Sequence, residues 1–106
     1  MQEFKGTPGP WCVNTIGKHW NNLALVHLEV TFGTDGECIC DTVYRREDAD
    51  LIAAAPELLE ALLGYMSAVE RMNQAMKDGV NVQGAISVLV GYEDMAHSAI
   101  NKALGK

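Results

Sequence analysis

The sequence is short of positive charge and has no long apolar run, and each shortage excludes a class of protein. It has 8 Lys and Arg residues against 14 Asp and Glu residues, so its net charge is -6. General binding to nucleic acid is therefore not expected, because contacts to a phosphate backbone need clustered cations. No run of about 18 apolar residues is present, so no membrane span is predicted. The first residues lack a cationic stretch followed by an apolar one, so we expect no signal peptide and a cytoplasmic location.

Cysteine is also scarce, with three residues in the chain. An odd count without a secretory signal predicts no disulfide framework. Structural zinc usually draws on cysteine pairs separated by two to four residues or histidine pairs separated by three to five, and neither pair is present. We therefore expect free, buried thiols and no cofactor, because unpaired cysteine packs as a small apolar group. The alternative left open is a small zinc-stabilised module with ligands from Cys12, Cys38, Cys40 and His27.

The first half of the chain has the composition of an arm followed by strands. Residues 1–10 are rich in proline and glycine, which predicts an extended arm or turn. From Leu28 to Phe32, apolar and polar residues alternate with the period of a half-buried strand. The turn-forming residues 33–36 suit a hairpin connection. Three strands are predicted, over residues 11–16, 23–32 and 37–44.

Strict alternation along the last of these strands predicts which side chains share a face. Ile39 and Val43 would point one way, whereas Cys38, Cys40 and Thr42 would point the other. The two thiols would then lie about 7 Å apart along one face, a spacing that suits neither a disulfide nor a tight metal chelate.

From Arg46 onwards the apolar residues recur at helical spacing. Asp48 or Asp50 can favour the start of a first helix. Pro56 is not tolerated inside a helix but suits its first turn, so a short helix is predicted to end near Ala55 and a long one to begin at Pro56. Gly79, in the left-handed conformation, would end the long helix. A third helix would begin near Asn81 and run antiparallel to the second, because the connection is short.

These elements predict one α+β domain over residues 1–106. Its arm spans residues 1–10, its β region residues 11–45 and its helical region residues 46–106. The expected fold is a small antiparallel sheet of about three strands, followed by a short helix and an antiparallel helical hairpin.

No motif predicts an enzyme. The chain has no phosphate-binding loop of the P-loop or dinucleotide type, and none of its serines lies in a G-x-S-x-G turn. Neighbouring carboxylates such as Glu93 and Asp94 point apart on a helix. We therefore expect a binding protein.

Two groups of residues are candidates for that binding. Arg45 and Arg46 follow Tyr44 at the strand-to-helix junction, where they would hold a small anion or form a solvated pair neutralised by the next two acidic residues. Aromatic residues dominate binding hot spots, although they would serve equally to cover the sheet. The candidate binding residues are Trp11, Trp20, Tyr44, Arg45 and Arg46.

The second helix carries a continuous stripe of leucine and methionine, of which Met66, Met72 and Met76 are the methionines. Most of this stripe is predicted to fill the core. A helical hairpin over a small sheet has limited area for burying two full apolar faces. Part of the stripe is therefore expected to be completed by a second copy, as a homo-oligomer, or by a target protein.

Two motifs resemble a family of small proteins of tailed bacteriophages and prophages. One motif is Thr7-Pro8-Gly9-Pro10-Trp11, and the other is the run Leu51-Ile52-Ala53-Ala54-Ala55-Pro56-Glu57-Leu58-Leu59-Glu60-Ala61-Leu62, with short strands between them. Members of that family usually have Asn-Ala-Arg where this chain has Asp48-Ala49-Asp50. The motifs cover about 20 residues, and the last thirty or so match none.

The resemblance implies a phage accessory protein that binds a host protein or protein complex, such as a component of a defence system, and inhibits or modulates it. It implies, as an alternative, an oligomeric sponge that sequesters a cyclic or phosphorylated nucleotide. Such a sponge would need to pool Arg45, Arg46 or Lys18 across subunits, because phosphate groups require several cationic donors.

Overall fold

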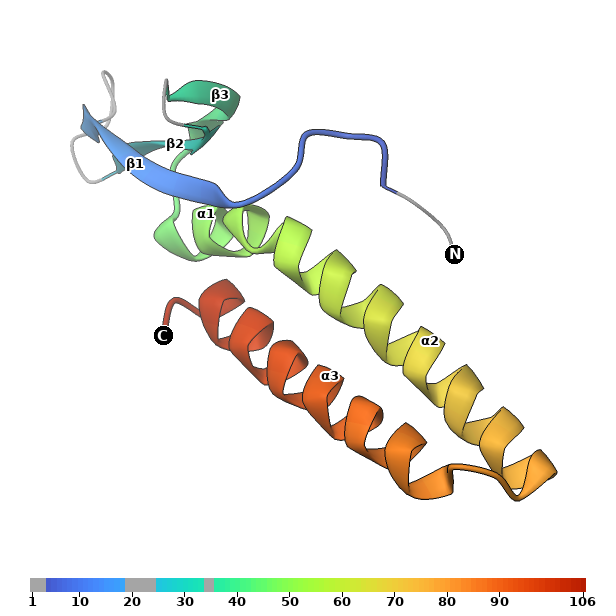
Figure 1. Cartoon of the computed structure of the whole chain (residues 1–106). Helices are drawn as coiled ribbons and strands as arrows, with labels where there is room; N and C mark the ends of the chain where they lie inside the picture. Colours follow the sequence, from blue (N-terminus) through green and yellow to red (C-terminus); the bar gives the residue numbers. More distant parts are fainter. Residues whose placement is uncertain (1–3, 19–24, 34–35) are drawn as a thin grey trace.

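The computed structural model describes residues 4–18, 25–33 and 36–106 (Figure 1). It has the predicted α+β arrangement, in which an antiparallel sheet with strand order β1-β2-β3 precedes one short and two long helices. Trp20 and the first residues of the predicted second strand lie outside the described residues. The elements are β1 (Trp11–Lys18), β2 (Val26–Phe32), β3 (Glu37–Val43), α1 (Arg46–Ala53), α2 (Ala55–Asp78) and α3 (Val82–Ala103).

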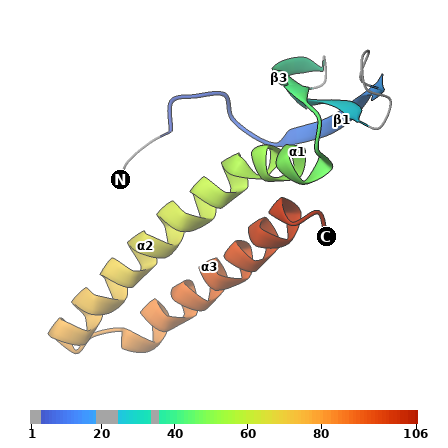
Figure 2. The same cartoon turned by 180° about the vertical axis from the view of Figure 1, so that it is seen from behind.

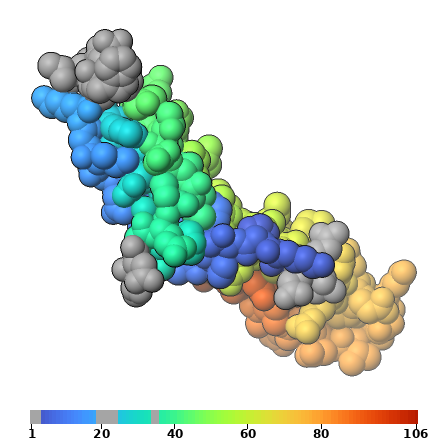
Figure 3. All heavy atoms as spheres, turned by 90° about the horizontal axis from the view of Figure 1, so that it is seen from above, coloured from blue at the N-terminus to red at the C-terminus, as the bar shows by residue number. Residues whose placement is uncertain are grey.

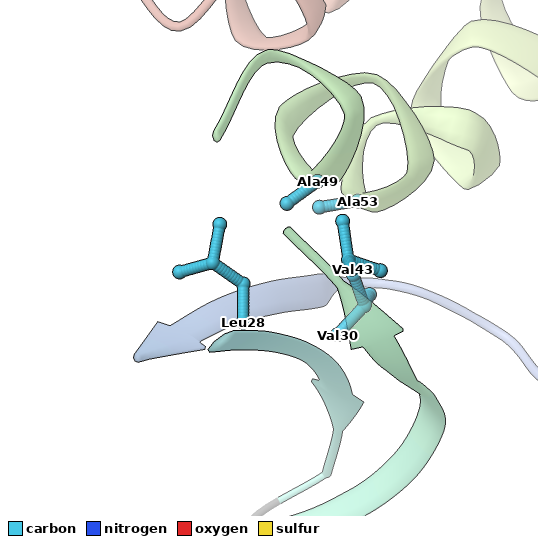
Figure 4. Close-up of a cluster of buried hydrophobic side chains, with 5 residues drawn as sticks. All are labelled: Leu28, Val30, Val43, Ala49 and Ala53. Carbon is cyan, nitrogen blue, oxygen red and sulfur yellow. The ribbon is translucent and has the colours of Figure 1, made fainter. Parts of the chain in front are cut away.

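The core lies between the sheet and α1 (Figure 4). Leu28 and Val30 of β2 are 2% and 0% exposed, and they point at Ala49 and Ala53 of α1. Val43 at the end of β3 completes the cluster. The alanines have no side chain beyond Cβ, so α1 can lie close to the sheet and cover it with only two turns of helix. The cluster is small, so each of its members matters to stability.

The predicted common face of Cys38 and Cys40 is wrong. Cys38 pairs with Thr31 and Cys40 pairs with Val30, so two β3 residues that are two positions apart have neighbouring partners on β2. This irregularity is a β-bulge, and it turns the two cysteines to opposite faces. Cys40 packs against the core, whereas Cys38 is exposed.

The helix boundaries follow the proline and glycine signals closely. Pro56 lies in the first turn of α2, and the chain bends by 45° between α1 and α2. Gly79 ends α2 at φ 67° and Asn81 precedes α3 at φ 56°, both left-handed as a tight helical turn requires. Asp48 lies in the first turn of α1, where a carboxylate favours the start of a helix, but neither Asp48 nor Asp50 is its cap. The helix starts at Arg46, upstream of both aspartates, and its N-cap residue makes no side-chain hydrogen bond.

α2 and α3 form an antiparallel hairpin whose seam is built from small residues (Figure 2). Ala61, Gly64 and Ala68 are buried on α2, and Ala85 and Ala99 are buried on α3. The ring of Tyr92 occupies the space where Gly64 lacks a side chain. Small seam residues let two helices approach closely, so the fully buried residues of the hairpin are small and its large apolar side chains are at most half-buried.

The molecule is long and narrow. Its extents are 63 × 25 × 18 Å and its radius of gyration is 18.2 Å, whereas a compact chain of this length has a radius of gyration of about 13 Å. The sheet and α1 form one end, and the turn between α2 and α3 forms the other (Figure 3). Among the described residues no single helix is long and apolar enough to cross a membrane; α1 and α2 reach that length and composition only as a bent pair.

The seam predicts opposite effects for two glycine-to-alanine substitutions. Gly64→Ala places a Cβ against the ring of Tyr92, so we expect a loss of about 1–3 kcal/mol in the free energy of unfolding. Gly91→Ala on α3 has nothing within 4 Å of the new Cβ, so it should raise stability by about 0.5–1 kcal/mol through helix propensity. Urea denaturation of both variants measures the difference. Equal effects would contradict the packing of Tyr92 on Gly64.

Candidate protein-binding surfaces

A hollow lies where β1, α1 and α3 meet, and we call it the junction hollow. Trp11 enters it from β1, Arg46 and Asp50 from α1, and Lys102 from the last turn of α3. Its volume is about 310 Å³, and Pro10, Cys12, Val13 and Ala53 complete its lining. Trp11 and Lys102 are 91 positions apart in the sequence, so only the folded chain brings these groups together.

Both cations of the junction hollow are paired with carboxylates. The Nζ of Lys102 donates to Glu57 Oε1 at 2.8 Å and to the backbone oxygen of Trp11 at 3.2 Å, which ties α3 to both α2 and β1. The Nε of Arg46 donates to Asp50 Oδ1 at 3.2 Å. These pairs are partly exposed to solvent, so each contributes about 1 kcal/mol or less. They also leave the hollow close to neutral.

Two buried polar atoms beside this network lack a partner in the described part of the chain: the indole Nε1 of Trp11 and the Oε2 of Glu57. A buried donor or acceptor without a partner lowers stability by about 1–3 kcal/mol. The end of the molecule around Trp11 therefore carries polar groups that the described residues do not satisfy.

The remaining predicted binding residues lie outside the lining of the junction hollow. The ring of Tyr44 is half-buried and lies 5.5 Å from the ring of His27, tilted by 44°. Arg45 is exposed and immediately precedes α1. Trp20 lies outside the described residues. The structure thus brings Trp11 and Arg46 together around one hollow and places Tyr44 beside a histidine.

The residues of the zinc alternative do not come together. Cys12 and Cys38 pair with Thr31 from opposite sides, which separates them by two strand spacings, about 10 Å. The Nε2 of His27 donates to the backbone oxygen of Asp41, and Cys40 packs in the core. No group of three or more His, Cys, Asp or Glu residues in the described ranges is arranged to hold a metal ion.

The Cys38 thiol is poorly suited to nucleophilic chemistry. Its pKa is raised above the ordinary value, first by desolvation and then by the carboxylates of Asp41 and Glu29. Reactive cysteines have the opposite environment, because a nearby cation or helix N-terminus lowers their pKa. Cys38 therefore stays mostly in the unreactive thiol form at neutral pH.

The hairpin has two faces of opposite character. One face, which we call the apolar face, carries a groove of about 310 Å³ lined by Leu58, Ala61, Leu62, Tyr65, Ala96 and Ile100. The opposite, polar face has two hollows whose linings include charged residues from both helices. Those residues are Glu57, Glu60, Asp94 and Lys102 near the sheet, and Arg71 and Asp78 near the turn.

The apolar face was assigned to the core by the sequence pattern, and this assignment is wrong for its largest residues. Leu62, Met66 and Met76 are 60%, 53% and 63% exposed. The sequence also carries a second candidate seam beside the stripe, which argues against burial of the large residues. Alanine recurs there every seven residues, at Ala61, Ala68 and Ala75. The helices pack through the small residues, so the large ones remain on the surface.

The raised pKa of Cys38 predicts its reactivity. In a Cys12→Ser/Cys40→Ala background, Asp41→Asn removes one carboxylate that raises the pKa, so the thiolate fraction and the rate of alkylation by iodoacetamide at pH 7.5 should rise severalfold. Glu47→Gln, in α1, is the control and should leave the rate unchanged. A rate that Asp41→Asn does not alter would contradict the proposed electrostatic environment.

Comparison with known proteins identifies the family to which the chain belongs. No curated protein and no solved structure matches the chain. One family model matches the whole chain, residues 1–106, and its description is Salmonella phage P22 protein Y8K6. This match confirms the coarser part of the resemblance, that of a small phage protein, while the grouping by the two sequence motifs stays a prediction. The chain therefore belongs to the family of the Salmonella phage P22 protein Y8K6.

Proposed function

We propose that this phage protein acts by binding rather than by catalysis. In the host cytoplasm it engages a host protein, a component of a defence system, and inhibits or modulates it. Membership of a phage family supports the setting. The surface that we assign to the host protein is the junction end of the molecule, around Trp11, Tyr44, Arg45 and Arg46.

One observation carries this assignment: Trp11 and Arg46 line the same hollow. Trp, Tyr and Arg are the residue types most enriched in binding hot spots, where they fill pockets and pair across an interface. Arg45 is exposed and does not line the hollow, so it continues the surface beyond it. Its positive charge, on a chain with net charge -6, favours a partner that presents a carboxylate at this point.

The geometry of the junction hollow disfavours the nucleotide sponge. Arg46 and Lys102 are already paired with Asp50 and Glu57. A phosphate group would have to displace these carboxylates or lie beside them, and like charges repel. The hollow suits a mixed protein surface better than a compact anion.

The binding surface is tested by reversing its charge. Arg45→Glu/Arg46→Glu should reduce recovery of the host protein at least about tenfold in affinity purification from phage-infected cells, because two hot-spot residues change sign. Arg71→Glu/Lys77→Glu, at the far end of α2, changes the net charge equally and is the matched control. It should recover as much host protein as the natural chain. Equal recovery with both double variants, or no stoichiometric host protein with the natural chain, would contradict the proposal.

The sponge alternative has its own test. A panel of cyclic dinucleotides at saturating concentration should leave the melting temperature of the protein unchanged, because a ligand that does not bind the folded state cannot stabilise it. Thermal-shift measurement provides the comparison. A melting temperature that rises with one of these nucleotides would establish the sponge in place of the host-protein proposal.

A further inference from the structure

We infer that the apolar face of the hairpin is covered by a second copy of this chain, so that the protein is a dimer joined through a four-helix bundle. This inference is separate from the proposed function, because none of the residues that line the groove of the apolar face lines the junction hollow.

The sequence of α2 provides two adjacent seams, and the chain itself occupies one of them. Ala61 and Ala68 are buried against α3. Beside them run Leu58, Leu62 and Tyr65, and the same alternating spacing of three and four residues continues to Met76. This is the a and d pattern of a helix that packs on a further helix. Ala96 and Ile100 of α3 line one side of that second seam, and Leu62 and Tyr65 within it are still exposed.

α3 carries the matching half of the pattern. Ile86 and Ile100 are 14 residues apart, which is two heptads, and both are exposed. Glu93 lies midway between them and interrupts the stripe. A polar residue at one seam position is a known means of fixing the register of helices at some cost in stability. The hairpin thus has the pattern of half a four-helix bundle.

The exposed side chains have the spread of a specific interface. On the apolar face Leu62, Tyr65, Met76, Ile86 and Ile100 are 37–63% exposed. These side chains extend along both helices of the hairpin, as an interface of standard size, about 800 Å² from each partner, requires. A two-fold dimer buries this area twice with a single surface, because an isologous interface is self-complementary.

The distribution of charge permits a copy to approach despite the net charge of -6. Carboxylates of the hairpin line the polar face, as Glu57, Glu60, Asp78 and Asp94 do. Two chains that meet through their apolar faces turn these four groups away from each other, and Glu93 is the acidic residue of the α3 stripe that enters the interface.

The hairpin also needs a permanent partner for its own stability. The largest fully buried side chains, Leu28 and Val30, belong to the sheet, whereas the buried residues of α2 and α3 are alanines and one glycine. Most helical stability in proteins comes from burying an apolar face. A second copy is present whenever the chain is made, so it provides that burial before any host protein is met.

The inference is tested by the mass of the full chain in solution. Sedimentation equilibrium of the natural protein should give twice the chain mass of 11.5 kDa, and its melting temperature should rise with protein concentration. A monomer at all concentrations, with a melting temperature independent of concentration, would overturn the inference without recourse to any variant.

Paired substitutions locate the interface. Leu62→Glu puts a charge at the centre of the apolar face in both copies, and it should raise the dissociation constant about 100-fold or more. Met95→Glu alters an apolar residue of the polar face that is 39% exposed, and it should leave the dimer intact. Arg45→Glu/Arg46→Glu should also remain dimeric. A Leu62→Glu protein that stays a dimer, or a Met95→Glu protein that dissociates, would place the contact elsewhere and overturn the inference.

Discussion

The close packing of α2 on α3 through alanine and glycine is the constraint on which the rest of the structure depends. Because Gly64 accepts the ring of Tyr92 and Ala61 and Ala68 carry no bulk, the two helices lie close together. Leu62, Tyr65 and Ile100 then line a groove on one face, and Glu57, Glu60 and Asp94 line a hollow on the other. A seam of leucines would have held the two helices further apart and would have buried large apolar side chains inside the hairpin itself. The small residues instead leave an apolar face exposed, and this is the face to which we assign a second copy.

The position of the hairpin relative to the sheet depends on a few contacts around α1. Ala49 and Ala53 rest on Leu28 and Val30, and the bend at Ala54 directs α2 away from the sheet. Lys102 closes the arrangement by binding both Glu57 and the backbone of Trp11. These contacts hold the sheet and the hairpin together, and the junction hollow lies among the same residues. The residues of the proposed binding surface are therefore held by contacts from β1, α1, α2 and α3, which favours an interface formed without rearrangement.

The positions of the helices and strands were predicted well, because single residues such as proline and glycine determine where these elements end. Pro56 and Gly79 set the ends of α2, and Gly33 and Gly36, both with positive φ, lie just after β2 and just before β3. Local rules failed where the outcome depends on pairing between elements. The bulges of β3 turn Cys38 and Cys40 apart, and alternation along one strand cannot reveal a bulge. The preference of α3 for the alanine side of α2 is likewise a tertiary choice. In the candidate site, Trp11 and Arg46 were predicted as binding residues from their residue types, but the contact between Trp11 and Lys102 could not be predicted from the sequence.

The two surfaces have a joint consequence for binding. A dimer formed through the hairpins carries two junction surfaces, one from each chain. If the two hairpins point in opposite directions, these surfaces lie at the two ends of a scaffold longer than a single molecule of 63 Å. If they point in the same direction, the two surfaces lie side by side at one end. In either arrangement the dimer would present two junction surfaces at a fixed separation to a host assembly with repeated subunits. Binding at the first site then raises the effective concentration at the second, and modest affinity at each site suffices for tight overall binding. In the proposed dimer, small size is compatible with strong inhibition, because the second copy would supply binding area that one chain of 106 residues lacks.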